Sequence, residues 1–295
     1  MELVVVGYGN MAKAILCGLL RQSKETLGIK NIVIAGRSPQ NIESWLTNIM
    51  QTYRSEFIND ITYKTTYDIY CDNKIILLAC KPYNLDSFLF HGNAKILYSV
   101  LAGINVNTLK NHIKSHNYVL IMPNIGANYG LSSTAVLWKQ NGTSKTIKES
   151  GKVLDIMLDN DTQEVKDIST NIKKQIVNFI SSFGNCEFVE NEEELLASIA
   201  TNGSAPALLS LVAQALINAG VKQGLKPDVS KRLVQKTFEG VAKLLEDKSP
   251  QEIKDLVTSP SGTTAEALLY CDENGVQGII TRALVKAVEK AKCSK

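Results

Sequence analysis

The feature that most constrains the fold is a glycine-rich turn close to the start of the chain. Residues 4–6 are three valines, and residues 7–12 read Gly-Tyr-Gly-Asn-Met-Ala. The valines are typical of a buried strand, and residues 11–21 form an amphipathic stretch typical of a helix. Gly7 permits a tight turn, Gly9 lets backbone approach a pyrophosphate, and the small Ala12 lets the helix pack closely on the sheet. A plain strand–turn–helix shares this glycine pattern, but the strand before it and the helix after it favour a dinucleotide-binding turn.

The second predicted strand indicates which dinucleotide binds. Residues 31–35 are apolar apart from Asn31 and lead into Gly36-Arg37-Ser38, without the acidic residue that holds a ribose 2′-hydroxyl in NAD-type folds. The Arg37 guanidinium and the Ser38 hydroxyl instead suit a 2′-phosphate. Arg37 as a solvated turn residue is the competing interpretation. We therefore predict NADPH as the cofactor, with NADH as the alternative, and expect Asn10 and Met11 to begin the helix whose free N–H groups face its phosphates.

Further apolar runs alternate with helix-length segments in the first half of the chain. They cover residues 74–80, 96–101, 118–122 and 134–138. This alternation is typical of an α/β fold, a mostly parallel Rossmann-type sheet with right-handed crossovers. Lys81, Gly103 and Asn124 fall at strand ends, so we expect them at the rim where such sheets bind ligands.

Residues 140–168 interrupt this alternation. They are polar, with one apolar patch at 153–158, and we interpret them as an inserted surface excursion holding one or two helical turns. A helix at 171–183 and a last strand at 186–189 follow. Together these observations predict a dinucleotide-binding domain over residues 1–191.

From residue 192 onward apolar residues recur at the spacing typical of helices. Residues 205–220 are apolar on nearly every side, and residues 249–252 read Ser-Pro-Gln-Glu, a capping box. A helix that is hydrophobic all round must be enclosed by a core or by another subunit. We therefore expect a helical domain over residues 192–295 that forms a homodimer interface.

A hydroxyl-rich segment at residues 258–264 lies between two predicted helices. The N–H groups of residues 262–264, with the hydroxyls of Ser259 and Thr264, suit a small carboxylate. The same residues also suit simple capping of the next helix. Spacing alone leaves both interpretations open.

Composition narrows the partners and the compartment. The 295 residues carry a net charge of +3 without a basic tract, which argues against nucleic acid and anionic membranes. We find no targeting signal and no apolar run of membrane-spanning length. Six scattered cysteines without a Cys-x-x-Cys pair fit reduced thiols in the cytoplasm. His112 and His116 have a spacing that allows metal binding, but a solvated helix face is the better interpretation, so we expect no metal.

Five ordered blocks of sequence resemble the pyrroline-5-carboxylate reductase family. They lie at residues 7–12, 79–82, 99–104, 122–124 and 257–264, the last being the family's most specific signature. The resemblance spans nearly the whole chain. It implies reduction of 1-pyrroline-5-carboxylate to L-proline by NAD(P)H, with a Rossmann domain and a helical domain that interlocks in dimers.

The resemblance also implies roles for individual residues. It implies cofactor contacts for Ala79, Cys80, Lys81, Ala102 and Gly103. These add to the cofactor contacts that the residue patterns above predict for Gly7, Gly9, Asn10, Met11, Ala12, Arg37, Ser38 and Asn124. It implies substrate contacts for Ser259, Gly262, Thr263 and Thr264, with Thr264 as a candidate proton donor beside the ring nitrogen. A protonated imine already accepts hydride well, so we expect the protein mainly to position the reactants.

The chain departs from the family pattern at a few positions. Ile125-Gly126 replaces Thr-Pro, Asn202 and Ala205 alter a Ser-Gly-Ser-Gly motif, and Ser261 replaces a glycine. These changes remove no group that the chemistry needs. They keep three alternatives open, namely another imine reductase, a hydroxyacid dehydrogenase, and a cofactor-binding relative without turnover.

Overall fold

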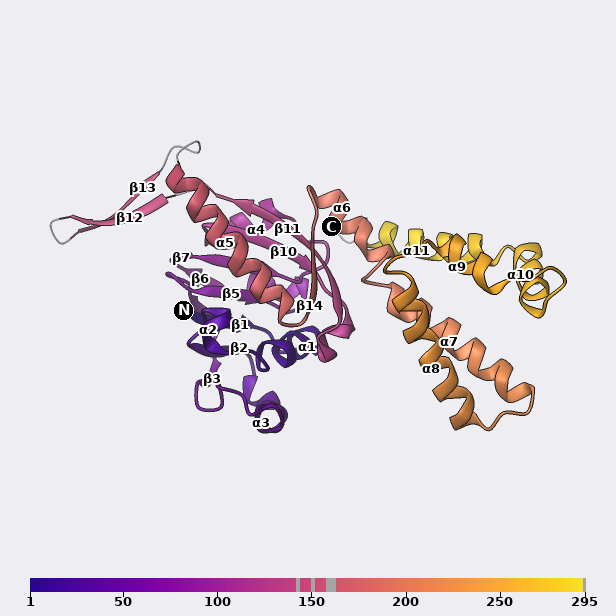
Figure 1. Cartoon of the computed structure of the whole chain (residues 1–295). Helices are drawn as coiled ribbons and strands as arrows, with labels where there is room; N and C mark the ends of the chain where they lie inside the picture. Colours follow the sequence, from indigo (N-terminus) through magenta and orange to yellow (C-terminus); the bar gives the residue numbers. More distant parts are fainter. Residues whose placement is uncertain (142–143, 150–151, 158–162, 294–295) are drawn as a thin grey trace. The chain divides into compact units, whose positions relative to one another are not determined.

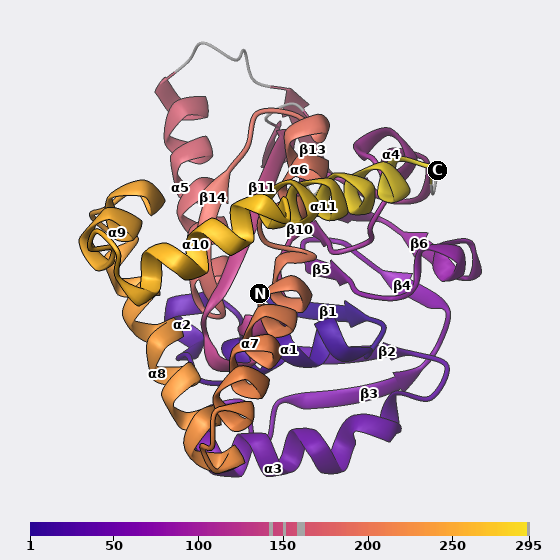
Figure 2. The same ribbon diagram turned by 90° about the vertical axis from the view of Figure 1, so that its right-hand side faces the viewer.

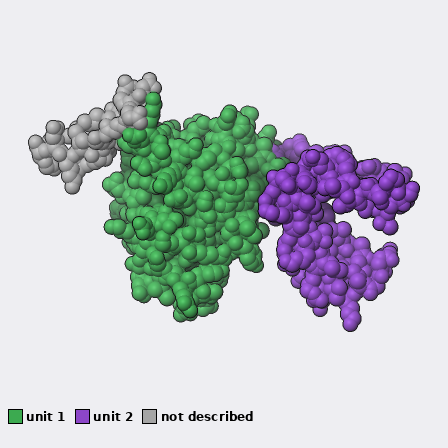
Figure 3. Space-filling view, in the orientation of Figure 1, with its two compact units in different colours: residues 1–203, 290–295 green, residues 204–289 purple. Residues whose placement is uncertain are grey.

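The computed structural model describes residues 1–141, 144–149, 152–157 and 163–293. The chain divides into two compact units, residues 1–203 with 290–295 and residues 204–289 (Figure 3). The short helix α6 (Glu192–Ala197) belongs to the first unit, where Leu195 is buried. The domain bounds 1–191 and 192–295 stay a prediction.

A twisted eight-stranded sheet forms the centre of the first unit (Figure 1). Its strands are β1 (Glu2–Val6), β2 (Asn31–Gly36), β3 (Ile61–Thr65), β5 (Ile75–Leu78), β8 (Ile96–Ser99), β10 (Asn117–Met122), β11 (Ser132–Gln140) and β14 (Gly184–Phe188). They lie in the order β14-β11-β10-β8-β5-β1-β2-β3. Every neighbouring pair is parallel except β10 with β11. The predicted mostly parallel Rossmann-type sheet is confirmed, and its strand order reverses between β1 and β5.

Two apolar cores cover the two faces of this sheet. Alternate residues of β1 point to opposite faces, so that Leu3 and Val5 join one core and Val4 and Val6 the other. The first core is covered by α1 (Asn10–Leu19), α3 (Glu43–Tyr53) and α5 (Gln163–Ser181), and the second by α4 (Val106–His112) and α6. Burial on both faces explains the continuous apolar runs of these strands.

Short elements fill the connections of the first unit. They are α2 (Lys24–Leu27) and the 3₁₀ turns η1 (Pro39–Ile42), η2 (Pro82–Ser87), η3 (Ile125–Tyr129) and η4 (Ser198–Ala200). Two small parallel pairs join β4 (Asp68–Tyr70) to β6 (Leu89–His91) and β7 (Asn93–Ala94) to β9 (Lys114–Ser115). None of these short strand pairs was predicted, because two or three residues carry no readable period.

Within residues 140–168 the predicted helical turns are present only from Gln163, where α5 begins, and the expectation was wrong for residues 144–157, which form strands. Strands β12 (Ser144–Glu149) and β13 (Lys152–Met157) pair antiparallel, with Glu149 opposite Lys152. Residues 142–143, 150–151 and 158–162 lie outside the described residues. The physical reason lies in the pattern, because two six-residue segments that follow each other closely along the chain suit a hairpin better than a helix. Helix α5 begins at Gln163, earlier than the predicted residue 171.

The second unit consists of helices with almost no buried side chains. They are α7 (Ala205–Lys222), α8 (Pro227–Leu244), α9 (Pro250–Val257), α10 (Thr263–Glu273) and, mostly within this unit, α11 (Val276–Lys292). Figures 1 and 2 show α7 and α8 side by side, and Ser230 of α8 donates a hydrogen bond to the Ile217 carbonyl of α7. Ser230 is the only residue of these two helices that is buried. This unit therefore has no closed core of its own.

One described segment is long and apolar enough to cross a membrane. It runs over Glu192–Lys222, with a mean hydropathy of 1.5 in its most apolar window, and no residue of that window is buried within the chain. The expectation that no apolar run reaches this length was therefore wrong. The segment comprises α6, η4 and α7, and length and composition do not separate a membrane helix from one that packs against protein.

Candidate functional site

The two glycines of the first turn have different surroundings. Gly7 adopts φ +96°, and a Cβ there would lie 2.5 Å from the Cys80 amide nitrogen. Gly9 adopts φ −72°, and a Cβ there would meet no atom within 4 Å. Gly7 is thus required by close packing of the β1 turn on the β5 turn. Gly9 instead leaves space in front of the helix that follows.

Helix α1 presents an open N-terminus at this space. Its N-cap residue is Gly9, no side chain caps its first N–H groups, and Gly9 and Asn10 are exposed. Ala12 is fully buried and lets the helix pack on the sheet, as predicted from its size. Uncapped N–H groups at the positive end of a helix suit a phosphate.

A cavity of about 530 Å³ lies beside this helix end. It is lined by Gly7, Tyr8, Gly9, Gly36, Arg37, Tyr67, Ala79, Cys80, Lys81, Tyr83, Asn84, Ser87 and Phe88. All of these residues except Tyr67, which follows β3, lie at or after the ends of β1, β2 and β5, so the cavity lies at the point where the strand order reverses. Dinucleotides bind at this point in doubly wound sheets. The structure therefore brings six predicted cofactor residues to one cavity: Gly7, Gly9, Arg37, Ala79, Cys80 and Lys81.

Arg37 and Ser38 differ in their contacts. Arg37 is exposed and lines the cavity, and no hydrogen bond or ion pair with another described residue holds its guanidinium. The Ser38 amide donates a hydrogen bond of 3.0 Å to the Tyr8 hydroxyl, and Ser38 does not line the cavity. The guanidinium is thus available to an anion, as a 2′-phosphate contact requires.

Aromatic residues of the cavity were missed by the sequence analysis. Tyr8, Tyr67, Tyr83 and Phe88 line it, and the Tyr67 and Phe88 rings lie 5.5 Å apart. Tyr8 lies within the glycine motif, and Tyr83 follows the strand-end residues Lys81-Pro82, so their positions were a usable signal. Tyr67 and Phe88 come from connections whose course the sequence did not reveal.

Cys80 is a packing residue of this site. Burial raises the pKa of its thiol to about 11, so the thiol stays neutral at physiological pH. A neutral thiol is a poor nucleophile, and the Cys80 backbone is what Gly7 contacts.

The remaining rim residues lie outside the large cavity. Gly103 adopts φ +77° and borders a separate space of about 30 Å³, and Ala102 is exposed. The Asn124 Oδ1 accepts a hydrogen bond of 2.9 Å from the Gly126 amide. Their predicted cofactor contacts, like those of Asn10, Met11 and Ser38, stay predictions.

The hydroxyl-rich segment in the second unit does not cap its helix. Gly262 is the N-cap residue of α10, and no side chain accepts a hydrogen bond from the first N–H groups. Ser261 adopts φ +58°, and a Cβ on Gly262 would collide with the Ser259 Oγ. Thr264 is half-buried, with no side-chain hydrogen bond to another described residue. The capping alternative is therefore wrong for these side chains. The Gly262 N–H donates to the Ser259 carbonyl at 3.0 Å, which leaves the N–H groups of Thr263 and Thr264 available to a carboxylate.

The two histidines considered for metal binding do not share a helix. Helix α4 ends at His112, and His116 follows strand β9. The His112 Nε2 contacts the Asp86 Oδ1 at 2.7 Å, and the His116 Nε2 contacts the Asn93 Nδ2 at 3.1 Å. Within the described residues, no group of three or more His, Cys, Asp or Glu side chains suits a metal ion.

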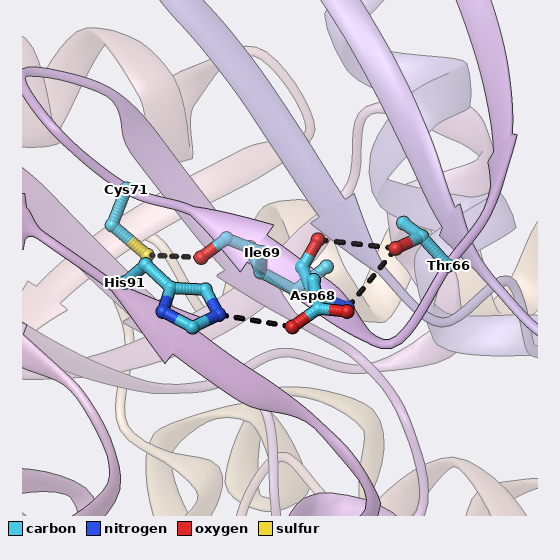
Figure 4. Close-up of polar contacts among 5 residues, drawn as sticks. All are labelled: Thr66, Asp68, Ile69, Cys71 and His91. Atoms are coloured by element: carbon cyan, nitrogen blue, oxygen red, sulfur yellow. Dashed lines mark hydrogen bonds and ion pairs between the residues drawn. The ribbon is translucent and has the colours of Figure 1, made fainter.

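A polar cluster supports one wall of the cavity (Figure 4). The His91 Nε2 of β6 contacts the Asp68 Oδ1 of β4 at 2.9 Å, and the Asp68 amide donates to the Thr66 Oγ1 at 3.0 Å. Tyr67 and Phe88 directly precede these two strands and line the cavity. The cluster therefore holds together the strands that carry this aromatic wall.

Comparison with known proteins assigns the family. A family model described as pyrroline-5-carboxylate reductase dimerisation matches residues 192–293, and one described as NADP oxidoreductase coenzyme F420-dependent matches residues 2–103. The pyrroline-5-carboxylate reductase of Helicobacter pylori (strain J99) is 38% identical over 286 residues, which cover 97% of this chain and 96% of that protein. The chain belongs to the pyrroline-5-carboxylate reductase family.

Solved structures of this reductase family share the fold. The 1-pyrroline-5-carboxylate reductase of Streptococcus pyogenes aligns with a TM-score of 0.71 at 24% identity, covering 99% of this chain and 98% of that one. The Plasmodium falciparum pyrroline carboxylate reductase, solved with NADP bound, aligns with a TM-score of 0.66 at 23% identity, covering 99% and 97%.

Two departures from the reductase pattern have local structural roles here. A Cβ on Gly126 would lie 2.6 Å from the Leu131 carbonyl oxygen, so only glycine fits this turn. The buried Asn202 Nδ2 donates to the carbonyls of Met122 and Ser133, at 2.6 and 3.0 Å. Asn202 thereby fastens the end of the first unit to β10 and β11.

Proposed function

We propose that this chain reduces 1-pyrroline-5-carboxylate to L-proline, with hydride supplied by NADPH. The observation that carries the proposal is 38% identity over nearly the full length to a pyrroline-5-carboxylate reductase. It is supported by a cavity at the sheet's switch point with an open helix N-terminus and an unpaired Arg37. The chain is an NAD(P)-dependent oxidoreductase of this family.

We assign different parts of the cofactor to residues at different positions in the cavity. The N–H groups at the start of α1 suit the pyrophosphate, and the absence of a Cβ on Gly9 leaves room for it. Arg37 faces the same cavity and suits a 2′-phosphate, which is why we propose NADPH over NADH. When bound, the reduced nicotinamide supplies hydride.

The substrate residues lie in the second unit. We assign the substrate carboxylate to the N–H groups of Thr263 and Thr264 with the Ser259 hydroxyl, and the ring-nitrogen proton to the Thr264 hydroxyl. Uncapped N–H groups at the start of α10 support this assignment. Because a protonated imine already accepts hydride, the protein's task is positioning and exclusion of water. This assignment requires the substrate segment to reach the nicotinamide end of the cofactor.

The assembly and compartment follow from the same family. The chain carries a dimerisation domain and is thus part of a homo-oligomer. We propose a homodimer, or an oligomer of dimers, built through the helices of the second unit, whose apolar side chains are exposed in the single chain. We place the protein in the cytoplasm, in keeping with six cysteines that form no disulfide.

A coupled assay tests the function. The purified chain should oxidise NADPH when given pyrroline-5-carboxylate and form proline in equal amount. Thr264→Ala should lower kcat at least about tenfold with the fold intact, because a positioned proton donor is lost. Thr281→Ala on α11, whose hydroxyl donates to the Gln277 carbonyl, is the control and should keep the rate. Turnover of a hydroxyacid, without NADPH loss on the imine, would reject the assignment.

A further inference from the structure

The second residue of the glycine motif makes a contact that a turn residue does not need. The Tyr8 hydroxyl accepts a hydrogen bond of 3.0 Å from the Ser38 amide, across the ends of β1 and β2. Its ring lies against Gly36, where a Cβ would be 3.1 Å from the Tyr8 Cε1. Tyr8 thus bridges the glycine turn and the Arg37 turn from inside the cavity that both line.

This contact leaves the Tyr8 hydroxyl able to donate one hydrogen bond. A tyrosine hydroxyl accepts and donates, and here the accepting side is taken by the Ser38 amide. A hydroxyl that accepts from an amide is polarised and becomes a stronger donor. The Tyr8 hydroxyl proton is not donated to any other described residue. The neighbouring Arg37 guanidinium likewise has no partner among the described residues.

We propose that Tyr8 is a specificity-determining residue that selects NADPH through the 2′-phosphate. The Tyr8 hydroxyl accepts a hydrogen bond from the Ser38 amide and donates its own proton to an oxygen of the 2′-phosphate. We call this pair of hydrogen bonds the relay, and Arg37 supplies the charge that neutralises the phosphate. A hydrogen bond to a charged oxygen is stronger than one to a neutral hydroxyl, so the relay favours the 2′-phosphate over the 2′-hydroxyl of NADH. This inference rests on the proposed function's assignment of NADPH as the cofactor, and it does not depend on which imine is the substrate.

A structural role for Tyr8 alone predicts a different result. If the ring only packs on Gly36, phenylalanine replaces it without effect on cofactor choice. If the phosphate instead needs the Ser38 amide itself, removing the Tyr8 hydroxyl frees that amide and tightens NADPH. The relay predicts the opposite sign.

Binding of the 2′-phosphate should be measured with Tyr8→Phe, which keeps the ring against Gly36. Dissociation constants for NADPH and NADH, and for 2′,5′-ADP and 5′-AMP as matched probes, come from fluorescence titration and calorimetry. We expect the NADPH and 2′,5′-ADP constants to rise about tenfold, and those for NADH and 5′-AMP less than about twofold.

A matched control removes a comparable hydroxyl elsewhere. Tyr53 accepts a hydrogen bond of 2.6 Å from the Arg21 Nη2, and Tyr53 does not line the cavity. Tyr53→Phe should leave all four constants unchanged. Equal losses for both cofactors in Tyr8→Phe, or tighter NADPH binding, would overturn the relay. Because no imine is present, failure to reduce pyrroline-5-carboxylate would reject the proposed function and leave this result standing.

Discussion

At the scale of single residues, the glycine turn shows two reasons for the same amino acid. Gly7 is held at a positive φ against the backbone of Cys80, whereas Gly9 has an ordinary φ and open space beyond it. The first glycine serves the fold, and we propose that the second leaves room for the ligand. The sequence motif alone does not separate these roles.

The two glycines should therefore respond differently to alanine. Gly7→Ala should lower the free energy of unfolding by about 2 kcal/mol or more, because the methyl group meets the Cys80 amide and a positive φ disfavours alanine. Gly9→Ala should keep the stability and raise the KM for NADPH, because its methyl group projects into the space for the pyrophosphate. Urea denaturation and steady-state kinetics on both variants provide the check; equal stability losses would contradict it.

Arg37 carries the second prediction at this scale. Arg37→Asp should weaken NADPH binding at least about tenfold and NADH binding much less, because the Arg37 side chain faces the cavity without a partner among the described residues and the new carboxylate repels a phosphate. Paired titrations with NADPH and NADH provide the measurement. Equal effects on both cofactors would refute the 2′-phosphate role.

The sequence revealed Arg37 but not Tyr8, for a physical reason. Arg37 was recognised because its charge and its place after a strand are local features. The contact of Tyr8 with Ser38 depends on β1 and β2 lying side by side, which no spacing in the chain displays.

At the scale of elements, long periodic segments were predicted and short ones were not. Sustained apolar periods in the sequence predict helices α7, α8 and α11 and strands β1, β2, β5 and β10. Strand β3 was missed because Ile61–Thr65 has only two half-buried positions and three exposed ones. The hairpin β12–β13 was misread because its apolar patch was taken for a helical one.

The end of α4 shows how a tertiary contact sets an element boundary. The Tyr118 hydroxyl donates to the Ile113 carbonyl and accepts from the Ser115 amide, which fixes the chain just after His112. His112 therefore turns to Asp86 instead of pairing with His116.

The third prediction concerns pH and His112. Hydrogen bonds to the Thr108 carbonyl and then to Asp86 raise the pKa of His112 above its ordinary value of 6.5. A raised folded-state pKa means that this stabilisation is present below about pH 6.5 and lost as pH rises through the folded-state pKa. Wild type should therefore exceed His112→Gln in unfolding free energy by more at about pH 5.5 than at about pH 8.5. Because Asp86 is largely exposed, the difference should be about 0.5 kcal/mol or less. Urea titrations at both pH values measure it, and a gap that widens with pH would contradict this origin.

At the scale of the whole molecule, the second unit lacks a core of its own. Leu211 is 65% exposed, and Leu216 and Leu233 are exposed as well. Apolar surface of this extent on adjacent helices marks an interaction site. A family model described as pyrroline-5-carboxylate reductase dimerisation matches residues 192–293, and we propose that a second copy of the chain covers this surface.

The fourth prediction follows from that surface. Leu211→Glu should weaken the oligomer and shift the mass in light-scattering chromatography toward a single chain. Losing one buried leucine per subunit costs about 1.5–3 kcal/mol, or at least about tenfold in the dissociation constant. Lys236→Gln on α8 removes only a solvent-exposed pair with Glu239 and should leave the mass unchanged. An unaltered mass for Leu211→Glu would show that α7 is not part of the interface.

The sequence by itself determined the Rossmann-type sheet, the helical second half, and the residues whose local chemistry suits phosphate and carboxylate. These features depend on the spacing of apolar residues, on residue type and on neighbours along the chain. Only the tertiary structure decided which strand ends meet in one cavity, which glycine serves packing, and that Tyr8 reaches Ser38. Contacts between residues far apart in sequence depend on strand order and close approach of backbones, and a linear pattern holds no record of either.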